Sequence, residues 1–386
     1  MSRPSVLQLI SSGGLYGAEN MALELTRALL HLGCPASLGV FLNVHRPNLQ
    51  VADAARSQGL EVELFECQGR IDRQTIRRVR DCLLRGRIDI LHTHGYKANT
   101  YGLLAAKGTS VKTIATSHNW PGRSLSLRAY GLLDRLQLRF FDRVCAVSES
   151  VRHRLLRSLV PDRKITVVRN GIDCERFRDG RSVLRNDLSS KDGLLVGYVG
   201  RLAPEKDLHS LLRAAKAILN TLPSISFVLC GEGPERRSLE ALALQLGIEN
   251  SVFFLGQRSD TPDLYSSFDV VVLPSLTEGM PLAVLEAMAA KKAVVASRVG
   301  AIPKILEDGK SGLLVEPGNT KELESALLRL LRNREMRLSF GQAGFDIVES
   351  NFSSKVMAQT YLSIYSEVLS TKFEDRILSP MESGRN

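Results

Sequence analysis

Residues 270–290 read VVVLPSLTEGMPLAVLEAMAA, and this stretch decides the fold class of the region around it. The apolar run Val270–Leu273 predicts a buried strand, and the apolar spacing from Leu282 to Ala290 predicts a helix. A loop that contains glycine and proline joins the two. This order of strand, loop and helix N-terminus is typical of α/β folds, which bind anions at such a junction.

Two carboxylates flank this loop, Glu278 before the helix and Glu286 within it. The backbone N–H groups around Gly279 to Leu282 would point out of the sheet towards phosphate or sugar oxygens. Glu286 would accept two hydrogen bonds from a cis-diol, as carboxylates do when they hold a ribose. The alternative is a capped helix with Glu286 on its surface, since acidic side chains are favourable near a helix N-terminus.

The composition indicates a globular protein of two domains. The 386 residues exceed what one ordinary core needs, and apolar residues make up 44% of the chain against 24% charged. No apolar run approaches the roughly 20 residues of a membrane span, and Val6–Ile10 predicts a first strand in place of a signal peptide. The six cysteines are scattered without a Cys-x-x-Cys pair, so we expect a reducing cytoplasm and no zinc site.

The net charge of +10 is concentrated in the N-terminal half. Residues 1–180 contain 27 basic and 16 acidic residues, a net charge of +11, and the remainder carries −1. Arginines interleaved with leucine and phenylalanine predict a basic amphipathic stretch that touches an anionic membrane surface or an anionic acceptor. The alternative is a solvated helix face. No nucleic-acid motif accompanies the charge, so we expect no nucleic-acid partner. The arginines are Arg123, Arg128, Arg135, Arg139, Arg143, Arg152, Arg154 and Arg157.

Short β-rich runs alternate with helical patterns from end to end. Such alternation predicts parallel sheets covered by helices, here two Rossmann-like doubly wound α/β domains that face a cleft. We expect the first domain to span 1–172 and the second 173–351. The predicted strands are 6–10, 37–42, 62–65, 88–91, 113–116, 144–147, 166–168, 194–199, 227–230, 252–255, 270–273, 294–296 and 313–315.

The loop after the first strand contains the paired glycines Gly13 and Gly14. A glycine lets a backbone approach a ligand where a Cβ would clash, so we expect a ligand at this loop. The loop lacks the Gly-x-Gly-x-x-Gly pattern, which argues against a nicotinamide cofactor. The alternative is a tight turn between strand and helix.

Three histidines lie at predicted strand ends of the first domain. His92 and His94 end one strand, and His118 follows the next. His92 and His94 point to one face of an extended chain because strand side chains alternate. We expect these residues, with Asn119, to line an acceptor or sugar pocket, and His118 is the best single candidate. A metal triad is the alternative, but no pattern of supporting residues accompanies it.

The sequence GRLAPEKD over 200–207 follows a predicted strand and places two cations, Arg201 and Lys206, at its end. Two fixed cations suit a diphosphate leaving group, whose negative charge grows as its bond breaks. No Asp-x-Asp, the simplest clamp for Mg²⁺ and a diphosphate, occurs in the chain, so we expect no metal requirement. The alternative is a surface ion pair of Lys206 with Glu205 or Asp207.

Two further glycine turns follow strands of the second domain, Gly231-Glu-Gly-Pro234 and Gly256-Gln-Arg258. Because parallel strands end at one edge of a sheet, we expect Gly231 and Arg258 to line the base of a nucleotide. The base stays open among uracil, guanine and adenine. Gly300, in a later loop, is expected to approach the ligand.

Taken together, these residues resemble glycosyltransferase family 4, a group of retaining, nucleotide-sugar-dependent enzymes with the two-Rossmann GT-B fold. The resemblance covers nearly the whole chain. Each motif is modest, and the ordered set is highly specific. The motifs are Gly13-Gly14, His118, Asn170-Gly-Ile-Asp173, Gly200-Arg-Leu-x-x-Glu-Lys206, Gly231-Glu-Gly-Pro234 and Glu278-x7-Glu286.

The resemblance implies a role for each matching position. Arg201 and Lys206 would bind the donor diphosphate, Glu286 the ribose hydroxyls, and Glu278 the donor sugar. His118 would contact the sugar near the reacting face, and these residues other than Glu286 would form the catalytic set. The leaving phosphate would act as base in a front-face attack, which agrees with the lack of an obvious nucleophile. The donor-binding set is Gly13, Gly14, Arg201, Lys206, Gly231, Arg258, Glu278, Gly279, Met280, Pro281, Leu282 and Glu286.

The resemblance also implies a C-terminal helix over 352–379 that crosses back to the N-terminal domain, before a tail over 380–386. The acceptor-side motifs resemble members that build exopolysaccharide or lipid-linked glycans in bacteria. The basic N-terminal half agrees with an acceptor at an anionic inner-membrane surface. We therefore expect a cytoplasmic, peripheral hexosyltransferase that moves a sugar from a nucleotide sugar to a hydroxyl of such an acceptor.

Two other functions fit the same architecture. A nucleotide-sugar 2-epimerase would release free nucleotide without an acceptor sugar. A non-catalytic sugar-nucleotide-binding subunit would bind the donor without turnover. The charged set of Arg201, Lys206, Glu278 and Glu286 favours transfer over both.

Overall fold

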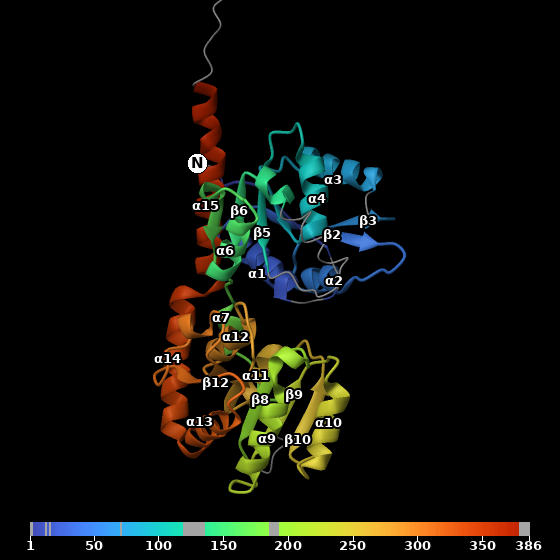
Figure 1. The fold of residues 1–386 in the computed structure, drawn as a ribbon. Coiled ribbons are helices and arrows are strands. Elements are labelled where there is room, and N and C mark those ends of the chain that lie inside the picture. The colour runs from blue at the N-terminus through green and yellow to red at the C-terminus, as the bar shows by residue number, and fades with distance from the viewer. Residues whose placement is uncertain are drawn as a thin grey trace, which may run out of the picture. The chain divides into compact units, whose positions relative to one another are not determined.

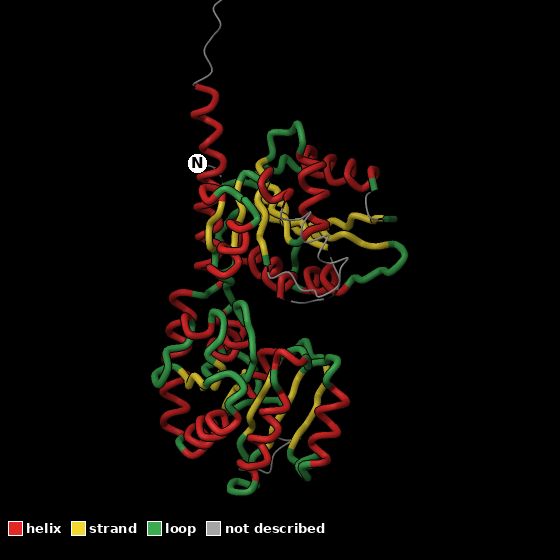
Figure 2. Tube along the Cα trace, viewed as in Figure 1, coloured by secondary structure: helices red, strands yellow, loops and turns green. Residues whose placement is uncertain are grey.

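The computed structural model describes residues 3–11, 14, 17–69, 72–118, 136–184 and 193–377, with side chains through residue 370. The chain folds as two compact units. Unit 1 comprises Met1–Gly171 and Ser354–Asn386, and unit 2 comprises Ile172–Ser353. Figures 1 and 2 show the strands of each unit flanked by helices. The predicted boundaries after residues 172 and 351 lie within two residues of these divisions.

Unit 1 contains a parallel sheet of seven strands in the order β3-β2-β1-β4-β5-β6-β7. The strands are β1 (Val6–Ser11), β2 (Ala36–Asn43), β3 (Val62–Cys67), β4 (Ile90–His94), β5 (Lys112–Ser117), β6 (Arg143–Ala146) and β7 (Ile165–Val167). The described helices are α1 (Gly17–His31), α2 (Gln50–Ser57), α3 (Arg73–Arg85), α4 (Tyr96–Ala106), η1 (Leu138–Phe140), α6 (Glu149–Arg157), η2 (Asp162–Lys164) and α15 (Ser354–Ile377).

Unit 2 contains a parallel sheet of six strands in the order β10-β9-β8-β11-β12-β13. The strands are β8 (Leu195–Val199), β9 (Ser226–Cys230), β10 (Val252–Gly256), β11 (Val270–Leu273), β12 (Ala293–Ser297) and β13 (Gly312–Val315). The described helices are α7 (Cys174–Arg178), η3 (Pro204–Lys206), α9 (Leu208–Leu219), α10 (Arg236–Gln245), α11 (Thr261–Ser267), α12 (Leu282–Ala289), η4 (Ile302–Lys304), α13 (Thr320–Arg332) and α14 (Arg334–Asn351).

Both sheets have the strand order of a doubly wound fold. The order reverses between β1 and β4 in unit 1, and between β8 and β11 in unit 2. Ligands of such sheets bind beyond the carboxyl ends of the strands, at this reversal. Every strand that the sequence predicts is present, and the prediction of two Rossmann-like α/β domains is confirmed.

Strand β1 shows why its sheet is covered on both faces. Val6 packs in a cluster with Met21 of α1 and Tyr361 of α15. Leu7 and Leu9 pack instead with residues of α3 and α4. Because side chains alternate in a strand, a continuous apolar run requires cover on both sides. Helix α15 supplies part of that cover for unit 1.

The predicted basic amphipathic stretch lies only partly within the described residues, because Arg123, Arg128 and Arg135 fall outside them. Phe141 of this stretch is fully buried, whereas Phe140 is 76% exposed. Within the parts of the chain that the structure describes, no helix is both long and apolar enough to cross a bilayer.

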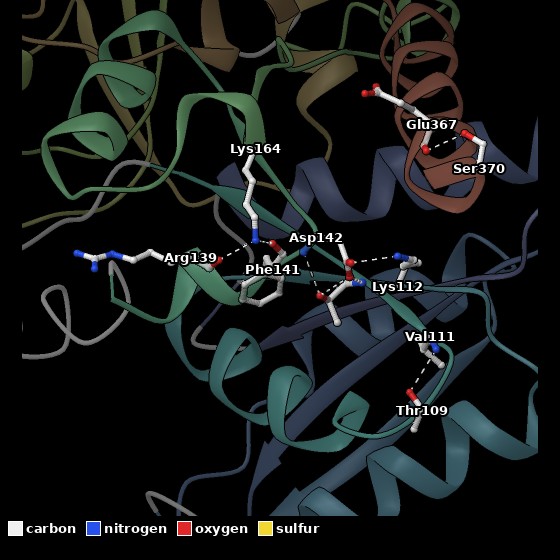
Figure 3. A network of polar contacts seen from close by, with 10 residues as sticks. Thr109, Val111, Lys112, Arg139, Phe141, Asp142, Lys164, Glu367 and Ser370 are labelled. Atoms are coloured by element: carbon white, nitrogen blue, oxygen red, sulfur yellow. Dashed lines mark hydrogen bonds and ion pairs between the residues drawn. The ribbon is translucent and has the colours of Figure 1, made fainter. Parts of the chain in front are cut away.

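Several cations in and near this stretch have partners inside unit 1. Arg143 forms an ion pair with Glu367 of α15. Figure 3 shows the ammonium of Lys164, which donates to the carbonyl oxygens of Arg139 and Phe141 at 2.8 Å each. Part of the basic charge in this region therefore stabilises the fold of unit 1.

Candidate active site

The loops after β8, β9 and β10 of unit 2 are joined by backbone hydrogen bonds. The Gly200 N–H donates to the carbonyl of Cys230 at 2.9 Å, and the Gly231 N–H donates to the carbonyl of Gly256 at 2.7 Å. All of these loops leave the carboxyl ends of parallel strands. The bonds therefore form one continuous rim at the edge of the sheet where ligands bind in this class of fold.

Two glycines of the rim are required by contacts between loops. A Cβ on Gly231 would lie 1.9 Å from the carbonyl oxygen of Gly200, and one on Gly300 would lie 2.2 Å from that of Glu278. Both have positive φ, +142° and +58°, which favours glycine. These glycines place one loop against the next, and their predicted contacts with a base or ligand stay predictions.

Lys206 and Glu278 form an ion pair on this rim, with Nζ 2.5 Å from Oε1. The Ser275 hydroxyl donates to the same oxygen at 2.7 Å. The two charged side chains are only 18% and 9% exposed, so water screens their attraction less than it would on an open surface. The alternative of a surface pair with Glu205 or Asp207 is wrong for Lys206, because its partner comes from a loop 72 residues later.

The loop that carries Glu278 has unused hydrogen-bonding groups. Oε2 of Glu278 accepts no hydrogen bond from any residue that the structure describes. Among those same residues, none accepts from the N–H groups of Gly279 and Met280. They precede Pro281 and the N-terminus of α12 at Leu282, which has no side-chain cap. A free carboxylate oxygen and free donors at the positive end of a helix suit hydroxyl and phosphate oxygens.

The two predicted arginines each have a carboxylate partner. Arg201 pairs with Glu205, with side chains 62% and 35% exposed, and its carbonyl accepts from Tyr198 at 2.9 Å. Arg258 donates from Nε to Asp260 at 2.8 Å, a bond that lowers the pKa of the Asp260 carboxyl. Such exposed pairs are worth only about 0–1 kcal/mol. A phosphate would therefore displace Glu205 from Arg201 at little cost.

Glu286 lies in α12 and accepts a hydrogen bond from the Tyr265 hydroxyl at 2.8 Å. Tyr265 belongs to α11 and is fully buried, in edge contact with Phe177 and Phe268. Burial, and then the Glu286 charge, hold the pKa of Tyr265 well above its usual value. The phenol therefore keeps its proton and fixes the orientation of the carboxylate.

Sequence reasoning missed two of these supporting residues. Ser275 stands three residues before Glu278 on the same loop, and that proximity was a usable signal. Tyr265 stands in a short helix 21 residues before Glu286, and only the packing of α11 beside α12 brings it close. Within the described ranges, no group of three or more His, Cys, Asp and Glu side chains is arranged to hold a metal.

His92 and His94 of unit 1 share one face of β4, as the alternation of strand side chains predicts, with ring centroids 4.5 Å apart. His92 is fully buried. Its Nδ1 lies 2.8 Å from the Tyr365 hydroxyl, and its Nε2 lies 2.7 Å from Oγ1 of Thr116. Burial lowers the pKa of His92 to about 3, so the ring is neutral.

His94 connects this interior to the strand end. It is 2% exposed, with Nε2 2.8 Å from Oε1 of Gln8 and Nδ1 3.5 Å from Nε2 of His118. His118 is half-buried just after β5, and burial lowers its pKa to about 4. The structure thus brings His118 to the strand end and places the other two histidines behind it.

The acceptor-side roles of these residues stay predictions. Any effect of His92 or His94 on an acceptor would be exerted through His118, since both rings are buried. Asn119 and Gly13 lie outside the described residues. Gly14 is described and has a φ of +140°, a conformation that favours glycine.

Two family models match the chain. Glycosyltransferase Family 4 matches residues 16–176, and Glycosyl transferases group 1 matches residues 181–346. The D-inositol 3-phosphate glycosyltransferase of Saccharomonospora viridis is 30% identical over 308 residues, which cover 74% of this chain and 71% of that protein. The N-acetyl-alpha-D-glucosaminyl L-malate synthase of Bacillus anthracis is 29% identical and covers 74% and 76%.

Solved structures share the fold. HepE of Anabaena, in complex with UDP, superposes with a TM-score of 0.79 at 23% identity, over 94% of this chain and 100% of that chain. The sucrose-phosphate synthase of Thermosynechococcus elongatus gives a TM-score of 0.75 at 20% identity, over 95% and 100%. Fold, family models and relatives agree. The chain therefore belongs to glycosyltransferase family 4, and it is a glycosyltransferase of the GT-B fold.

Proposed function

We propose that the protein is a retaining enzyme that moves a sugar from a nucleoside-diphosphate sugar to a hydroxyl of a polysaccharide or lipid-linked glycan. The observation that carries this proposal is the shielded cluster of Lys206, Glu278 and Ser275 on the loop rim of unit 2. It combines a cation for a diphosphate with a carboxylate for sugar hydroxyls, at the strand ends where doubly wound sheets bind ligands.

Two relatives support the choice of acceptor. An Escherichia coli protein named UDP-Gal:alpha-D-GlcNAc-diphosphoundecaprenol alpha-1,3-galactosyltransferase is 28% identical over 66% of this chain and 70% of its own length. The Staphylococcus aureus capsular polysaccharide biosynthesis glycosyltransferase CapM is 28% identical over 62% of this chain and 65% of its own. The first name indicates a lipid-linked acceptor, and the second indicates a polysaccharide.

The donor would be held by side chains that can give up a present hydrogen-bond partner or accept a further hydrogen bond. Its diphosphate would lie against Lys206 and Arg201, displacing the exposed Glu205 from the arginine. Glu286, oriented by Tyr265, would accept from the ribose hydroxyls. Hydroxyls of the sugar would meet the open oxygen of Glu278 and the N–H groups beside it.

Catalysis would come from charge stabilisation of the leaving group. The negative charge on the diphosphate increases as the glycosidic bond breaks, so a fixed ammonium stabilises the transition state more than the bound donor. Glu278 is held by Lys206 and Ser275 and acts as an acceptor of sugar hydroxyls, so it does not serve as nucleophile. The leaving phosphate would take the acceptor proton on the same face, which retains the anomeric configuration. We propose no metal in this step.

Calorimetric titration with UDP, GDP and ADP, first with EDTA and then with Mg²⁺, tests the donor site. Metal-independent binding of one nucleotide is expected, and it selects the donors for an acceptor screen. Proton NMR of the first product then reports its anomeric configuration. An inverted product overturns retention, and a requirement for Mg²⁺ overturns the role given to the cations alone.

The same experiment separates the two other functions. An epimerase would release free nucleotide from the sugar nucleotide without any acceptor. A binding subunit would bind the nucleotide and show no turnover with any acceptor mixture. Transfer that depends on an added acceptor excludes both.

We propose in addition that the enzyme works as a peripheral protein at the cytoplasmic face of an anionic membrane. The net charge of +11 over residues 1–180 supports this. Two large side chains, Phe140 at 76% and Leu159 at 70%, are exposed in unit 1. Arg139 donates to the Ser158 carbonyl at 3.2 Å, which brings the two apolar positions into one region. Basic charge beside exposed apolar residues is typical of membrane-surface binding.

A further inference from the structure

A buried chain of hydrogen bonds in unit 1 connects His118, at the end of β5, with helix α15. Every member except His118 is at most 2% exposed. The members sit on adjacent strands, since Gln8 of β1 is in register with His92 of β4, and His94 with Thr116 of β5. The chain passes in order through His118, His94, Gln8, Tyr365, His92, Thr116 and Tyr361.

The upper arm of this chain runs from Gln8 to His118, and its direction follows from the Gln8 amide. Oε1 of Gln8 can only accept, so Nε2 of His94, 2.8 Å away, carries a proton. Burial lowers the pKa of His94 well below its usual value, and a neutral imidazole has only one N–H. Nδ1 of His94 is therefore an acceptor, and Nε2 of His118, 3.5 Å away, is the donor to it.

The lower arm leaves the other end of the same amide. Nε2 of Gln8 donates to the Tyr365 hydroxyl at 3.3 Å, and Nδ1 of His92 lies 2.8 Å from the same hydroxyl. A buried hydroxyl needs an acceptor for its own proton, so we assign the Tyr365 proton to Nδ1 of His92. Nε2 of His92 then donates to Oγ1 of Thr116 at 2.7 Å. The amide is satisfied at both ends, and reversing it would require every partner to exchange its proton. The lower arm ends at α15 without touching His118.

We propose that Gln8 and His94 are positioning residues that hold His118 in the tautomer with its proton on Nε2, so that Nδ1 is presented to a ligand as an acceptor. This inference rests on the proposed function, and on the role that the family resemblance implies for His118, which is contact with the transferred sugar. No residue in the described ranges donates a hydrogen bond to this Nδ1. The tautomer of a histidine is commonly set by the bond that its other nitrogen makes.

A His118 fixed in this way selects the chemistry of its ligand. A bare Nδ1 accepts a hydrogen bond from a hydroxyl, and it has no proton to donate to a phosphate oxygen. Burial lowers the pKa of His118 to about 4, so the ring stays neutral near pH 7. The ligand group at His118 is therefore a hydrogen-bond donor such as a sugar hydroxyl, and not a phosphate oxygen.

Nitrogen-15 NMR of the full chain with labelled histidine tests this assignment without any substrate. Protonated and bare ring nitrogens give separate signals, and the spectrum of His118→Gln identifies the His118 pair by its loss. We expect the wild-type protein at pH 7 to carry the His118 proton on Nε2. A proton on Nδ1 of His118 would show that the Gln8 amide has the opposite orientation and that every hydrogen bond of this buried network has the opposite direction. That result overturns the proposal.

Two substitutions separate positioning from general support of the fold. Gln8→Met removes the acceptor of His94 and keeps an unbranched side chain, so His118 should lose its single tautomer. Transfer should then slow about tenfold, as expected when one hydrogen bond to the transferred sugar is weakened. Tyr361→Phe is the control. It removes the hydroxyl bonded to Thr116 at the far end of the lower arm and leaves both ends of the Gln8 amide bonded, so it should lower the melting temperature and leave the His118 tautomer and the transfer rate unchanged.

The outcomes decide between positioning and structure. A wild-type tautomer in Gln8→Met, or equal slowing in both variants, would show that Gln8 only supports the fold. If Gln8→Met does not fold, the wild-type spectrum alone still decides the tautomer. The proposed function fails separately. If the His118 proton lies on Nε2 but the protein neither binds nucleotide nor transfers sugar, Gln8 and His94 still position His118, and the proposed reaction is refuted.

Discussion

Lys206 and Glu278 meet across two loops of unit 2, with Nζ 2.5 Å from Oε1. One loop follows β8 and the other follows β11, the two strands that flank the reversal of strand order. The ion pair therefore marks the place where a doubly wound sheet binds its ligand. Ser275 donates to the same oxygen and keeps the carboxylate in one orientation.

Lys206→Ala should lower turnover about 10²–10³-fold, the usual loss when one group that stabilises a developing charge is removed. The Kd of the nucleotide should change less, because the ammonium acts most strongly as the leaving group gains charge. Steady-state kinetics beside calorimetry measures both quantities. Lys310→Ala, at a lysine that is 78% exposed, is the matched control. Unchanged turnover in Lys206→Ala would place the diphosphate elsewhere.

Glu286→Ala should weaken binding of the preferred nucleoside diphosphate and abolish the preference of the protein for this nucleotide over its 2′-deoxy analogue. Tyr265→Phe leaves the carboxylate in place and removes the bond that orients it. For Tyr265→Phe we expect the binding free energy of the nucleotide to weaken by about 1 kcal/mol, the typical worth of one hydrogen bond, or roughly fivefold in Kd. Calorimetry with both nucleotides measures these effects. A Glu286→Ala variant that still prefers the ribonucleotide would refute the assignment of Glu286 to the ribose.

The strand pattern was enough to predict the fold. Buried parallel strands such as Val270–Leu273 are short apolar runs in the sequence, and loops that contain glycine separate them from the helices. Glu278 and Glu286 stood out because both belong to one strand-loop-helix segment. The fold class and the segment that carries the two carboxylates could thus be predicted from local sequence.

The partners of these residues could not be predicted, because they depend on which loops the sheet brings together. For Lys206 the sequence offered only Glu205 or Asp207 as alternative partners to a diphosphate, whereas the order of β8 and β11 brings Glu278 to it. The two buried histidines show the same limit. Strand alternation predicts that His92 and His94 share one face of β4. Only the packing of α15 within unit 1 shows that this face is buried.

The buried histidines predict a loss of stability in mild acid. The pKa is about 3 for His92, about 4 for His118 and well below the usual value for His94. Between pH 6.5 and 4 the unfolded chain binds protons that the native state does not, so the free energy of unfolding falls as pH falls. Each histidine contributes about 1.4 kcal/mol per pH unit within its window.

Urea unfolding at pH 7.5, 6.0 and 5.0 measures this slope, with His92→Gln as the test variant. It should unfold more readily than the wild type at pH 7.5 and show a slope smaller by about one proton. Carboxylates whose pKa is lowered, such as Asp260, lose their contribution only below their usual value of 3.8, outside this range. If the free energy of unfolding of His92→Gln depends on pH as steeply as that of the wild type, His92 does not contribute to the acid sensitivity.

Binding to anionic vesicles should depend on the basic charge of unit 1 and on salt. Each basic residue near the surface contributes about 1 kcal/mol, and the attraction is screened within roughly 10 Å at 0.1 M salt. Co-sedimentation with phosphatidylglycerol vesicles, compared with phosphatidylcholine, should therefore decline from low to high salt.

Arg157→Glu, at an exposed arginine of unit 1, should weaken binding to these vesicles. Arg329→Glu, the same charge change at an exposed position of unit 2, should not. Binding that resists salt and instead falls in Phe140→Ser would identify apolar insertion as the main force. Equal losses in both arginine variants would show that net charge acts without a defined surface.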